Sequence, residues 1–433
     1  MISGEPPRFL ASLALAMGLT ALASGLAQAQ DTSLRMWTFL NPEGTSGREK
    51  ALARIIQDFE AANPGVRIQV EQQVWDQLTP KFLAAHDAGS APDVVWVNSD
   101  LLGTVIQSGA LADIRSQFTD ADLADLDNEL LRAATVDGAL YGTGQSYMIY
   151  GLIARGRYLA EAGVTEDSIR SWDDLLEVAR KLTVREGDTV TRWGLCQNLG
   201  MTKVDPGVLL AHLLTGAGDT PAFDAAGQAH WANERGVEGI RRVVELIDEG
   251  VSPPEAVNWN NDEMYDQFAA GRCAMITGAS VRVGNMQGAT GDDAISFIRY
   301  PSGTPGTPSN HAISNWTTGV WSGSPRKEEA ARLIAALSSP EADQEWVTMG
   351  GTIPFRASTA TTLADHMGEE KYRFLGTAMD YIRASGWVPP FGADISGYRD
   401  DMNRAIQQVL LRGADPLAAL SEAEQAYNGR HGY

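Results

Sequence analysis

Residues 94–97 read Val-Val-Trp-Val, a continuously apolar run that is followed by the polar residues Asn98, Ser99 and Asp100. A short run of this kind is typical of a β-strand that helices bury on both faces. Two earlier segments, 33–39 and 66–70, alternate apolar and polar residues, which indicates two more strands. The pattern therefore predicts three strands between residues 33 and 97.

Helical patterns separate these strands. Ser46 and Glu49 form a capping-box pattern, in which each side chain bonds the backbone of the other residue at a helix start. Apolar residues then recur at helical spacing, at positions 52, 55, 56 and 59, and a second apolar helix face follows over residues 78–83. Both segments are expected to be helices that pack on the sheet.

The alternation of strands and helices predicts right-handed βαβ units and a parallel sheet. Open sheets of that kind bind ligands beyond the carboxyl ends of their strands. The expected place for a site is therefore the set of loops that follow Phe39, Val70 and Val97.

A second α/β region is expected after residue 143. Residues 137–144 read Asp-Gly-Ala-Leu-Tyr-Gly-Thr-Gly, and this glycine-rich stretch favours a hinge loop over residues 137–150. Residues 301–308 have no hydrophobic periodicity and indicate an extended connection. Further along, helices are expected at 171–182, 237–247, 328–337 and 402–411, and a short buried strand at 273–277.

The first 29 residues have the layout of a secretory signal peptide. Arg8 precedes the apolar stretch Leu10–Leu22, and small residues follow up to Ala29, where cleavage is expected. An uncleaved membrane anchor is the weaker alternative, because the apolar stretch is short for a span. No cysteine stands at the cleavage position. We therefore expect an exported periplasmic protein without a lipid anchor.

Acidic side chains outnumber basic ones by 55 to 34, which gives a formal net charge of −21. Such a chain repels nucleic-acid phosphates and anionic lipid surfaces, so neither is expected as a partner. The same charge favours a soluble monomer. It also opposes an anionic ligand, which would have to be held by a few local donors.

The chain contains two cysteines, Cys196 and Cys273, both in strand-like runs. An oxidising compartment permits a disulfide between them. The alternative is a pair of buried thiols that pack as small hydrophobic side chains. The sequence is compatible with both.

Five short motifs follow one another along the chain. They are Phe-Glu-Ala-Ala-Asn-Pro-Gly-Val at 59–66, Ser-Ala-Pro-Asp-Val-Val at 90–95, Asp-Gly-Ala-Leu-Tyr-Gly at 137–142, Ser-Trp-Asp-Asp-Leu at 171–175 and Gly-Gly-Thr-Ile-Pro at 350–354. In this order, behind a signal peptide, they resemble the type 1 extracellular solute-binding proteins of sugar-importing ABC transporters. That group includes the maltose- and glycerophosphate-binding proteins.

The resemblance implies a two-lobe α/β fold, the type II periplasmic-binding-protein fold of the maltose-binding kind. Each lobe would be a mostly parallel sheet flanked by helices, with a ligand cleft between the lobes. By analogy, lobe one is expected at 31–143 plus 300–345, and lobe two at 144–299 plus 346–433. The boundaries remain expectations from the resemblance.

The same resemblance implies a periplasmic substrate-binding component of an ABC importer. Such a protein is not an enzyme: it captures its ligand by cleft closure and delivers it to permease subunits in the membrane. The ligand would be a carbohydrate or polyol. No cofactor and no metal are expected.

A sugar pocket needs aromatic rings for the C–H faces of the sugar and planar polar groups for its hydroxyls. Tryptophans near strand ends or in polar company are the candidates for stacking, with core packing as the alternative for each: Trp37, Trp75, Trp316 and Trp387. Candidate hydrogen-bonding residues lie in the expected loops: Asn41, Glu43, Ser99, Asp100, Gln145, Ser146, Tyr147, Ser280 and Arg356.

Two of these polar candidates have a specific alternative. The position of Asp100 resembles that of an aspartate in the maltose-binding members, where the carboxylate accepts hydrogen bonds from ligand hydroxyls. The alternative is that Asp100 caps the next helix. Arg356 could donate to two hydroxyls or to an anionic substituent, and a salt bridge is the competing interpretation.

An exported glycoside hydrolase is the main alternative from another class, because two carboxylates suffice for that chemistry. The sequence contains no nucleophile elbow, zinc-binding helix motif or phosphate-binding loop. The acidic residues between 120 and 129 lack calcium-loop spacing and are expected to form a solvated helix face. A sugar-sensing binding protein without a transporter is the third possibility.

Overall fold

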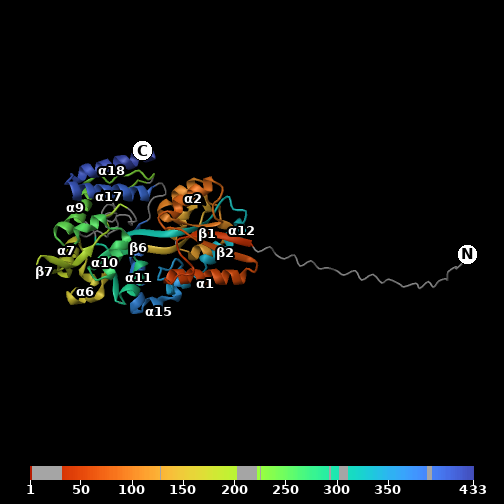
Figure 1. Cartoon of the computed structure of the whole chain (residues 1–433), viewed down its shortest axis with the longest axis horizontal. Coiled ribbons are helices and arrows are strands. Elements are labelled where there is room, and N and C mark those ends of the chain that lie inside the picture. Colours follow the sequence, from red (N-terminus) through yellow and green to blue (C-terminus); the bar gives the residue numbers. More distant parts are fainter. Residues whose placement is uncertain are drawn as a thin grey trace.

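A ten-stranded sheet runs through the molecule, and helices cover both of its faces (Figure 1). Its main path follows the order β2 (Val66–Gln72), β1 (Thr32–Thr38), β3 (Val94–Asn98), β11 (His311–Val320), β6 (Thr143–Arg155), β9 (Cys273–Ala279), β8 (Thr189–Cys196) and β7 (Val184–Glu186). Two short strands join this path: β10 (Ile295–Ile298) pairs with β6, and β12 (Gly386–Trp387) pairs with β11.

The computed structural model describes residues 32–126, 128–201, 222–224, 226–291, 294–301, 311–387 and 393–433, together with Met1. The expected signal peptide beyond Met1 and residues 302–308 of the expected connection lie outside this part of the chain. Within the described ranges, no helix has both the length and the apolar character needed to cross a membrane.

The first three strands and two helices form where the sequence predicts them. α1 (Gly47–Ala62) connects β1 to β2, and α2 (Leu78–Asp87) connects β2 to β3. β1 pairs in parallel with both neighbours, with Met36 opposite Val70 on one side and Val94 on the other. The carboxyl ends of the three strands therefore lie at one edge of the sheet, as the βαβαβ pattern predicts.

The start of α1 is fixed on two sides. Ser46 caps the helix, and Ser46 and Glu49 each bond the backbone of the other, so the predicted capping box is confirmed. The carbonyl oxygen of Met349 lies against Gly47, where an added Cβ would come within 1.9 Å of it. This close approach requires glycine and holds the first turn of α1 against the turn that follows α13 (Pro340–Thr348).

Two long antiparallel strands join the halves of the sheet. β11 pairs with β3 from Trp316 to Val320 and with β6 from Ile313 to Thr318. β6 then continues and pairs with β9 and β10 through residues 150–155. The sheet is therefore mixed: among the strands of its main path, the expected parallel pairing is confined to β2-β1-β3 and to β8 with β9.

The prediction of a hinge loop at 137–150 is wrong for residues 143–150, which lie in the 13-residue strand β6. The glycines suggested a loop, but the apolar run that follows, Tyr-Met-Ile-Tyr-Gly-Leu-Ile-Ala at 147–154, pairs its backbone with neighbouring strands. Tertiary pairing outweighs local turn propensity here.

A disulfide ties the two parallel strands of the second half together. Cys196 ends β8 and Cys273 begins β9, and the two residues form a disulfide with a Cα–Cα distance of 5.8 Å. Both are fully buried. Of the two alternatives that the sequence left open, the structure therefore has the disulfide.

On the second half, α7 (Trp172–Leu182) and α9 (Glu234–Asp248) lie close to their predicted positions, whereas α10 (Asn261–Ala269) and α11 (Arg282–Thr290) were not predicted from the sequence. Ser171 caps α7 in a second capping box, with Asp174 as the partner. Smaller elements complete the chain up to β9: η1 (Ser99–Leu101), α3 (Leu102–Gln107), η2 (Arg115–Gln117), α4 (Asp120–Asp125), α5 (Asn128–Ala134), β4 (Thr135–Val136), β5 (Ala139–Leu140), α6 (Gly156–Glu161), η3 (Glu166–Ser168) and η4 (Pro254–Asn258).

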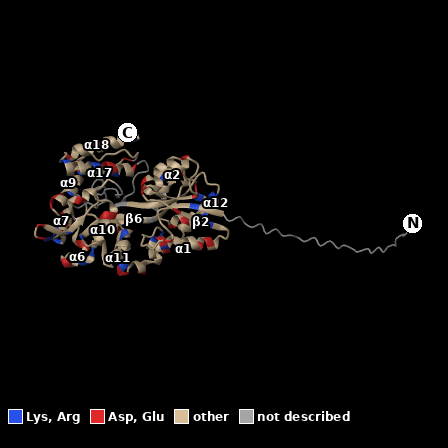
Figure 2. Ribbon diagram, viewed as in Figure 1, with Lys and Arg blue, Asp and Glu red and all other residues tan. Residues whose placement is uncertain are grey.

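The C-terminal third supplies helices to both halves. α12 (Lys327–Leu337) and α13 pack against α1, whereas α17 (Ile395–Arg412) and α18 (Pro416–His431) pack against α9 (Figure 1). Between them lie α14 (Ala357–Thr362), α15 (Ala364–Met367), η5 (Glu370–Tyr372) and α16 (Arg373–Ser385). Figure 2 shows acidic and basic residues dispersed over these outer helices.

Candidate functional site

Three neighbouring strands align one row of side chains at the carboxyl end of β3. Trp316 of β11 is opposite Asn98 of β3 on one side and Gln145 of β6 on the other. Residues opposite each other in antiparallel strands point to the same face of the sheet. The row therefore places an aromatic ring between two amides at the edge where the sequence predicts a site.

Aromatic rings extend this row toward α1. The Phe39 ring, directly after β1, lies 4.6 Å from the Trp316 ring centroid to centroid and 5.7 Å from the Trp96 ring. The Arg48 guanidinium carbon lies 5.6 Å from the Phe39 ring centroid. Trp316 and Trp96 are buried, so the rings form a platform supported by the core.

Gln145 is the most unusual residue of the row. Its side chain is fully buried, and neither its amide oxygen nor its amide nitrogen has a hydrogen-bond partner among the residues that the structure describes. Most buried polar groups in proteins are hydrogen-bonded, and leaving one unpaired costs about 1–3 kcal/mol. An amide of this kind at a strand end can both donate to a ligand and accept from it.

The loop after β3 is held by short polar contacts. The Ser99 hydroxyl lies 3.1 Å from the Ser314 hydroxyl and accepts a hydrogen bond from the backbone of Asn315 at 3.2 Å. Asn98 caps η1 and accepts from the Asp100 backbone N–H at 2.9 Å. Asn98, not Asp100, is therefore the cap, and the half-buried Asp100 carboxylate lies in the first turn of η1.

The loop after β2 carries two further groups near the same edge. Trp75 is half-buried and packs against the core. The next residue, Asp76, has a buried carboxylate oxygen to which no residue in the described part of the chain donates a hydrogen bond. Trp37, by contrast, donates its indole N–H to Glu71 at 2.7 Å and is buried in β1, so its polar atom is already paired.

Ser280 connects the two halves of the sheet. Its backbone N–H donates to the Ile149 carbonyl at 2.8 Å, and its hydroxyl accepts from the Ile149 N–H at 3.3 Å. Ser280 is fully buried, so it fixes β6 against the end of β9. Tyr147, two residues before Ile149 in β6, is also buried.

The remaining candidates fall into two groups. Asn41 and Glu43 lie in the loop after β1, where the Asn41 side chain accepts from the Glu43 N–H at 3.0 Å and Glu43 is exposed. Ser146 lies in β6 and Trp387 in β12, and the description of both is limited to their backbone.

Arg356 is bound within the protein. Its Nε donates to the Ser338 carbonyl at 2.6 Å, and its Nη1 donates to the Asp125 carboxylate at 3.0 Å. Its side chain is 2% exposed. These contacts favour the salt-bridge interpretation, and they show that Asp125 of the acidic segment is not simply a solvated residue.

Asp343 lies beneath this ion pair. Its carboxylate accepts from the backbone N–H groups of Arg356 at 3.0 Å and of Phe355 at 3.3 Å. Burial outweighs these hydrogen bonds and raises the pKa of Asp343 to about 7. This cluster stabilises the fold and lies apart from the strand-end row.

Four residues near the strand ends were not predicted from the sequence: Phe39, Arg48, Asp76 and Arg282. Phe39 and Asp76 lie in loops that the sequence did mark as site-forming, so their positions could have identified them. Arg48 and Arg282 lie in the first turns of helices that follow such loops. A rule that included the first helical turn after each strand would have found both.

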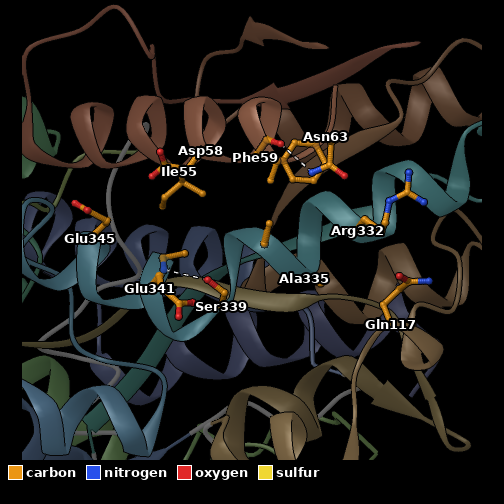
Figure 3. A pocket seen from close by; sticks show the side chains of 13 residues that line it. Ile55, Asp58, Phe59, Asn63, Gln117, Arg332, Ala335, Ser339, Glu341 and Glu345 are labelled. Atoms are coloured by element: carbon orange, nitrogen blue, oxygen red, sulfur yellow. Dashed lines mark hydrogen bonds between the residues drawn. The ribbon is translucent and has the colours of Figure 1, made fainter. Parts of the chain in front are cut away.

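A separate cavity lies between α1 and the α12–α13 pair (Figure 3). It has a volume of about 490 Å³, and its rim carries Asp58, Glu341 and Glu345 together with Arg332. A second cavity of about 540 Å³ is lined by residues of α9, α17 and α18. Neither is lined by the strand-end residues described above.

The fold and this strand-end arrangement define a bacterial solute-binding protein. Residues 44–344 match the model of the bacterial extracellular solute-binding protein family, and the chain belongs to that family. An uncharacterized lipoprotein of Streptomyces antibioticus is 26% identical over 396 residues, which cover 88% of this chain and 82% of the relative.

Solved structures share the two-lobe, maltose-binding-like fold. An ABC transporter solute-binding protein of Thermotoga lettingae, bound with α-D-tagatose, superposes with a TM-score of 0.77 at 20% identity and covers 92% of this chain and all of its own. The GacH receptor of Streptomyces glaucescens, solved unliganded and with acarbose, gives a TM-score of 0.77 at 19% identity and covers 92% and 98%.

Proposed function

We propose that this protein is the exported substrate-binding component of an ABC importer and that it binds a sugar, a polyol or a derivative of one. The observation that carries the proposal is the row of Asn98, Trp316 and Gln145 at the carboxyl edge of the sheet. The chain belongs to a family of solute-binding proteins, so a row of this composition is a candidate ligand site. The two structural neighbours named above were solved with sugar ligands, which supports the same ligand class.

The chemistry of the row suits a polyhydroxylated ligand. Trp316 and Phe39 offer aromatic faces for C–H groups, and the unpaired Gln145 amide offers one donor and one acceptor side. Asp100 and Asp76 are the carboxylates that would accept hydroxyl hydrogen bonds, which are stronger for a charged acceptor. Ser99, Trp75, Asn41 and Glu43 are the remaining candidates around them.

The two crossing strands suggest how binding would close the protein. β6 and β11 are shared by both halves of the sheet, so bending at residues 149 and 313 would rotate one half toward the other. We propose lobe boundaries near 31–143 plus 300–345 and 144–299 plus 346–433. A closed, ligand-bound form would then be the species that the permease subunits recognise.

Export by a cleavable signal peptide ending at Ala29 completes the proposal, with a soluble monomer in the periplasm. The Streptomyces relative is named a lipoprotein, so the mode of attachment needs its own test. Mass spectrometry of the protein purified from its native envelope should give a chain beginning at Gln30 without a lipid mass. A lipidated N-terminus would overturn this part.

A ligand screen tests the binding function. Thermal unfolding of the purified protein is measured against neutral sugars and polyols, because a ligand present at about 100 times its Kd adds roughly 2.7 kcal/mol to stability. We expect one-to-one saturable binding, a smaller radius of gyration on binding, and no change in the ligand after prolonged incubation. Turnover of a glycoside would instead support the hydrolase alternative.

A further inference from the structure

The cavity between α1, α12 and α13 is lined by none of the strand-end residues, and we call it the α1–α12–α13 cavity. It has a volume of about 490 Å³ and lies where α12 and α13 pack against α1 (Figure 3). The side chains that α12 and α13 present to it include Ala335, Ala336 and Ala342, which are too small to fill the space. Protein interiors rarely leave voids of this size, whereas binding sites have them.

The floor of the α1–α12–α13 cavity is apolar. Ile55 and Phe59 of α1 line it, and each of them is only 5% exposed because its other contacts are with the core. Figure 3 shows both side chains across the cavity from Ala335 of α12. An apolar side chain that entered the cavity would therefore contact apolar groups on both walls and lose its exposure to water, which is favourable.

Three carboxylates lie toward one end of the cavity and give that end a negative charge. They belong to Asp58 of α1 and to Glu341 and Glu345 of α13. Glu341 and Glu345 are four positions apart, so they share one helix face, and like charges at that spacing repel each other. In Figure 3 the three carboxylates lie on the side opposite Arg332, with Ala335 between them and it. The cavity therefore has an apolar middle and an acidic end.

The acidic end has little counter-charge of its own. Neither Glu341 nor Glu345 forms an ion pair with any residue that the structure describes. Asp58 forms one at 3.0 Å with an arginine one turn earlier on α1, but both side chains are more than half exposed, so this pair is weak. Arg332, the one cation among the described residues that line the cavity, lies 3.8 Å from Glu329 instead. A cation that enters the acidic end would therefore be stabilised by carboxylates that have no competing partner.

An apolar floor beside these carboxylates fits a cationic group on an apolar stem, which is the form of a lysine or arginine side chain. We propose that the α1–α12–α13 cavity is the docking site for a basic segment of a partner protein. The segment packs apolar side chains on the floor and sets a lysine or arginine among the three carboxylates. The net charge of −21 attracts a basic partner and opposes a second copy of this chain in the same place.

Synthetic peptides test this docking chemistry on the purified protein. The probe is a short amphipathic peptide of leucine and lysine, and titration calorimetry measures its binding at low ionic strength. Two matched peptides replace every lysine by glutamate or every leucine by serine. We expect the leucine–lysine peptide to bind one to one, and both matched peptides to bind at least roughly tenfold more weakly, since one lacks the positive charge and the other lacks the apolar surface.

Variants locate the docking site. Glu341→Gln combined with Glu345→Gln removes two of the three carboxylates and should weaken binding of the leucine–lysine peptide by roughly tenfold. Ala335→Trp fills the cavity without changing its charge and should abolish binding. Thermal unfolding shows which variants are folded, and either one provides the test if the other is not. Glu328→Gln combined with Glu255→Gln is the control: both residues are exposed and lie outside the cavity, so the same loss of charge should leave binding unchanged.

The inference is overturned if the leucine–lysine peptide does not bind, if the glutamate peptide binds equally well, or if a folded cavity variant keeps full affinity. An equal loss of affinity in the control variant also overturns it, because net charge alone would then explain the binding. Self-association of the protein that Ala335→Trp abolishes would assign the cavity to a second copy instead. None of these results bears on the proposed function, since sugar binding is measured separately and should be unchanged in every variant.

Discussion

Arg356 and Asp125 are 231 positions apart in the sequence and form an ion pair in which Nη1 lies 3.0 Å from Oδ2. The Asp125 carboxylate also accepts from the backbone N–H and the hydroxyl of Ser358, at 2.8 and 2.6 Å. One carboxylate thus fixes the start of α14 against the end of α4. Removing it would leave the buried Arg356 charge with Asp122, at the longer distance of 4.0 Å, as its remaining carboxylate partner among the described residues.

Asp125→Ala is therefore expected to lower the free energy of unfolding by roughly 2–3 kcal/mol, since breaking one side of a buried pair costs far more than breaking a surface pair. Urea denaturation measures the loss. Asp120→Ala is the matched control on the same helix, because Asp120 is 96% exposed and pairs only at the surface with Arg115. Equal effects of the two variants would contradict the structural role of Asp125.

The disulfide gives a second prediction. Cys196 and Cys273 are 77 positions apart in the sequence, so the cross-link restricts the unfolded chain and is expected to contribute about 4.5 kcal/mol in the chain-entropy model. Thermal unfolding with and without a reductant should show a lower Tm for the reduced protein. Cys196→Ser with Cys273→Ser should reproduce that value and be insensitive to reductant. A double variant as stable as the oxidised protein would contradict the prediction.

Asp343 predicts a dependence of stability on pH. Its pKa is about 7 in the folded protein, whereas an aspartate in an unfolded chain titrates near 3.9, so the folded protein binds this proton more tightly. The bound proton therefore adds to the free energy of unfolding. This stabilisation is complete below about pH 4 and is lost as the pH rises to about 7, by at most roughly 1.4 kcal/mol per pH unit.

Asp343→Asn cannot titrate, so its stability deficit relative to the native protein should shrink between pH 5 and pH 8. Urea unfolding at several pH values measures this difference. Glu341→Gln, an exposed change on the same helix, serves as the control and should leave the pH profile unchanged. A deficit for Asp343→Asn that stays constant across this range would show that Asp343 does not titrate there.

Gln145 predicts a separation of stability from binding. Replacing its buried amide by leucine should leave the free energy of unfolding unchanged or slightly raised, because the amide makes no hydrogen bond to the residues that the structure describes. Binding of the sugar found in the screen should weaken by roughly tenfold, the cost of about one hydrogen bond. Thermal unfolding and calorimetry measure the two effects.

Thr318→Val is the matched control for Gln145→Leu. Thr318 is also buried, and its hydroxyl has no hydrogen-bond partner within the described ranges, but it lies two residues beyond Trp316 in β11, opposite Trp96 and deeper in the sheet. Its replacement should leave both stability and ligand affinity largely unchanged. Unaltered affinity in Gln145→Leu, or equal loss in both variants, would remove Gln145 from the site.

Local sequence patterns predicted the first strands and helices of the chain correctly. The apolar run at 94–97, the capping box of Ser46 with Glu49 and the spacing of the α1 face each express short-range physics, and the structure has β3 and α1 at those positions. The strand-end loops were also predictable, because parallel βαβ units place them at one edge. That prediction brought Ser99 and Asp100 into consideration, whereas Trp316 was considered because its neighbours in the sequence are polar.

Strand pairing and ion pairs between residues that are distant in the sequence could not be predicted from local patterns. The glycines before residue 145 suggested a loop, yet β6 is continuous because β11, β9 and β10 pair with its backbone. Arg356 was expected near a ligand, and its guanidinium group instead bonds Asp125 and Ser338. Each of these outcomes depends on a partner that is distant in sequence.

The sequence by itself determined the first three strands and two helices and the family resemblance, and it predicted the edge at which a ligand should bind, because these follow from periodicity, caps, motifs and strand order. Only the tertiary structure decided which groups are already paired and which remain available. It buries Arg356 in an ion pair, joins Cys196 to Cys273 and leaves the Gln145 amide without a hydrogen-bond partner among the residues that the structure describes. Pairing is a property of distance in space, and a linear sequence does not specify it.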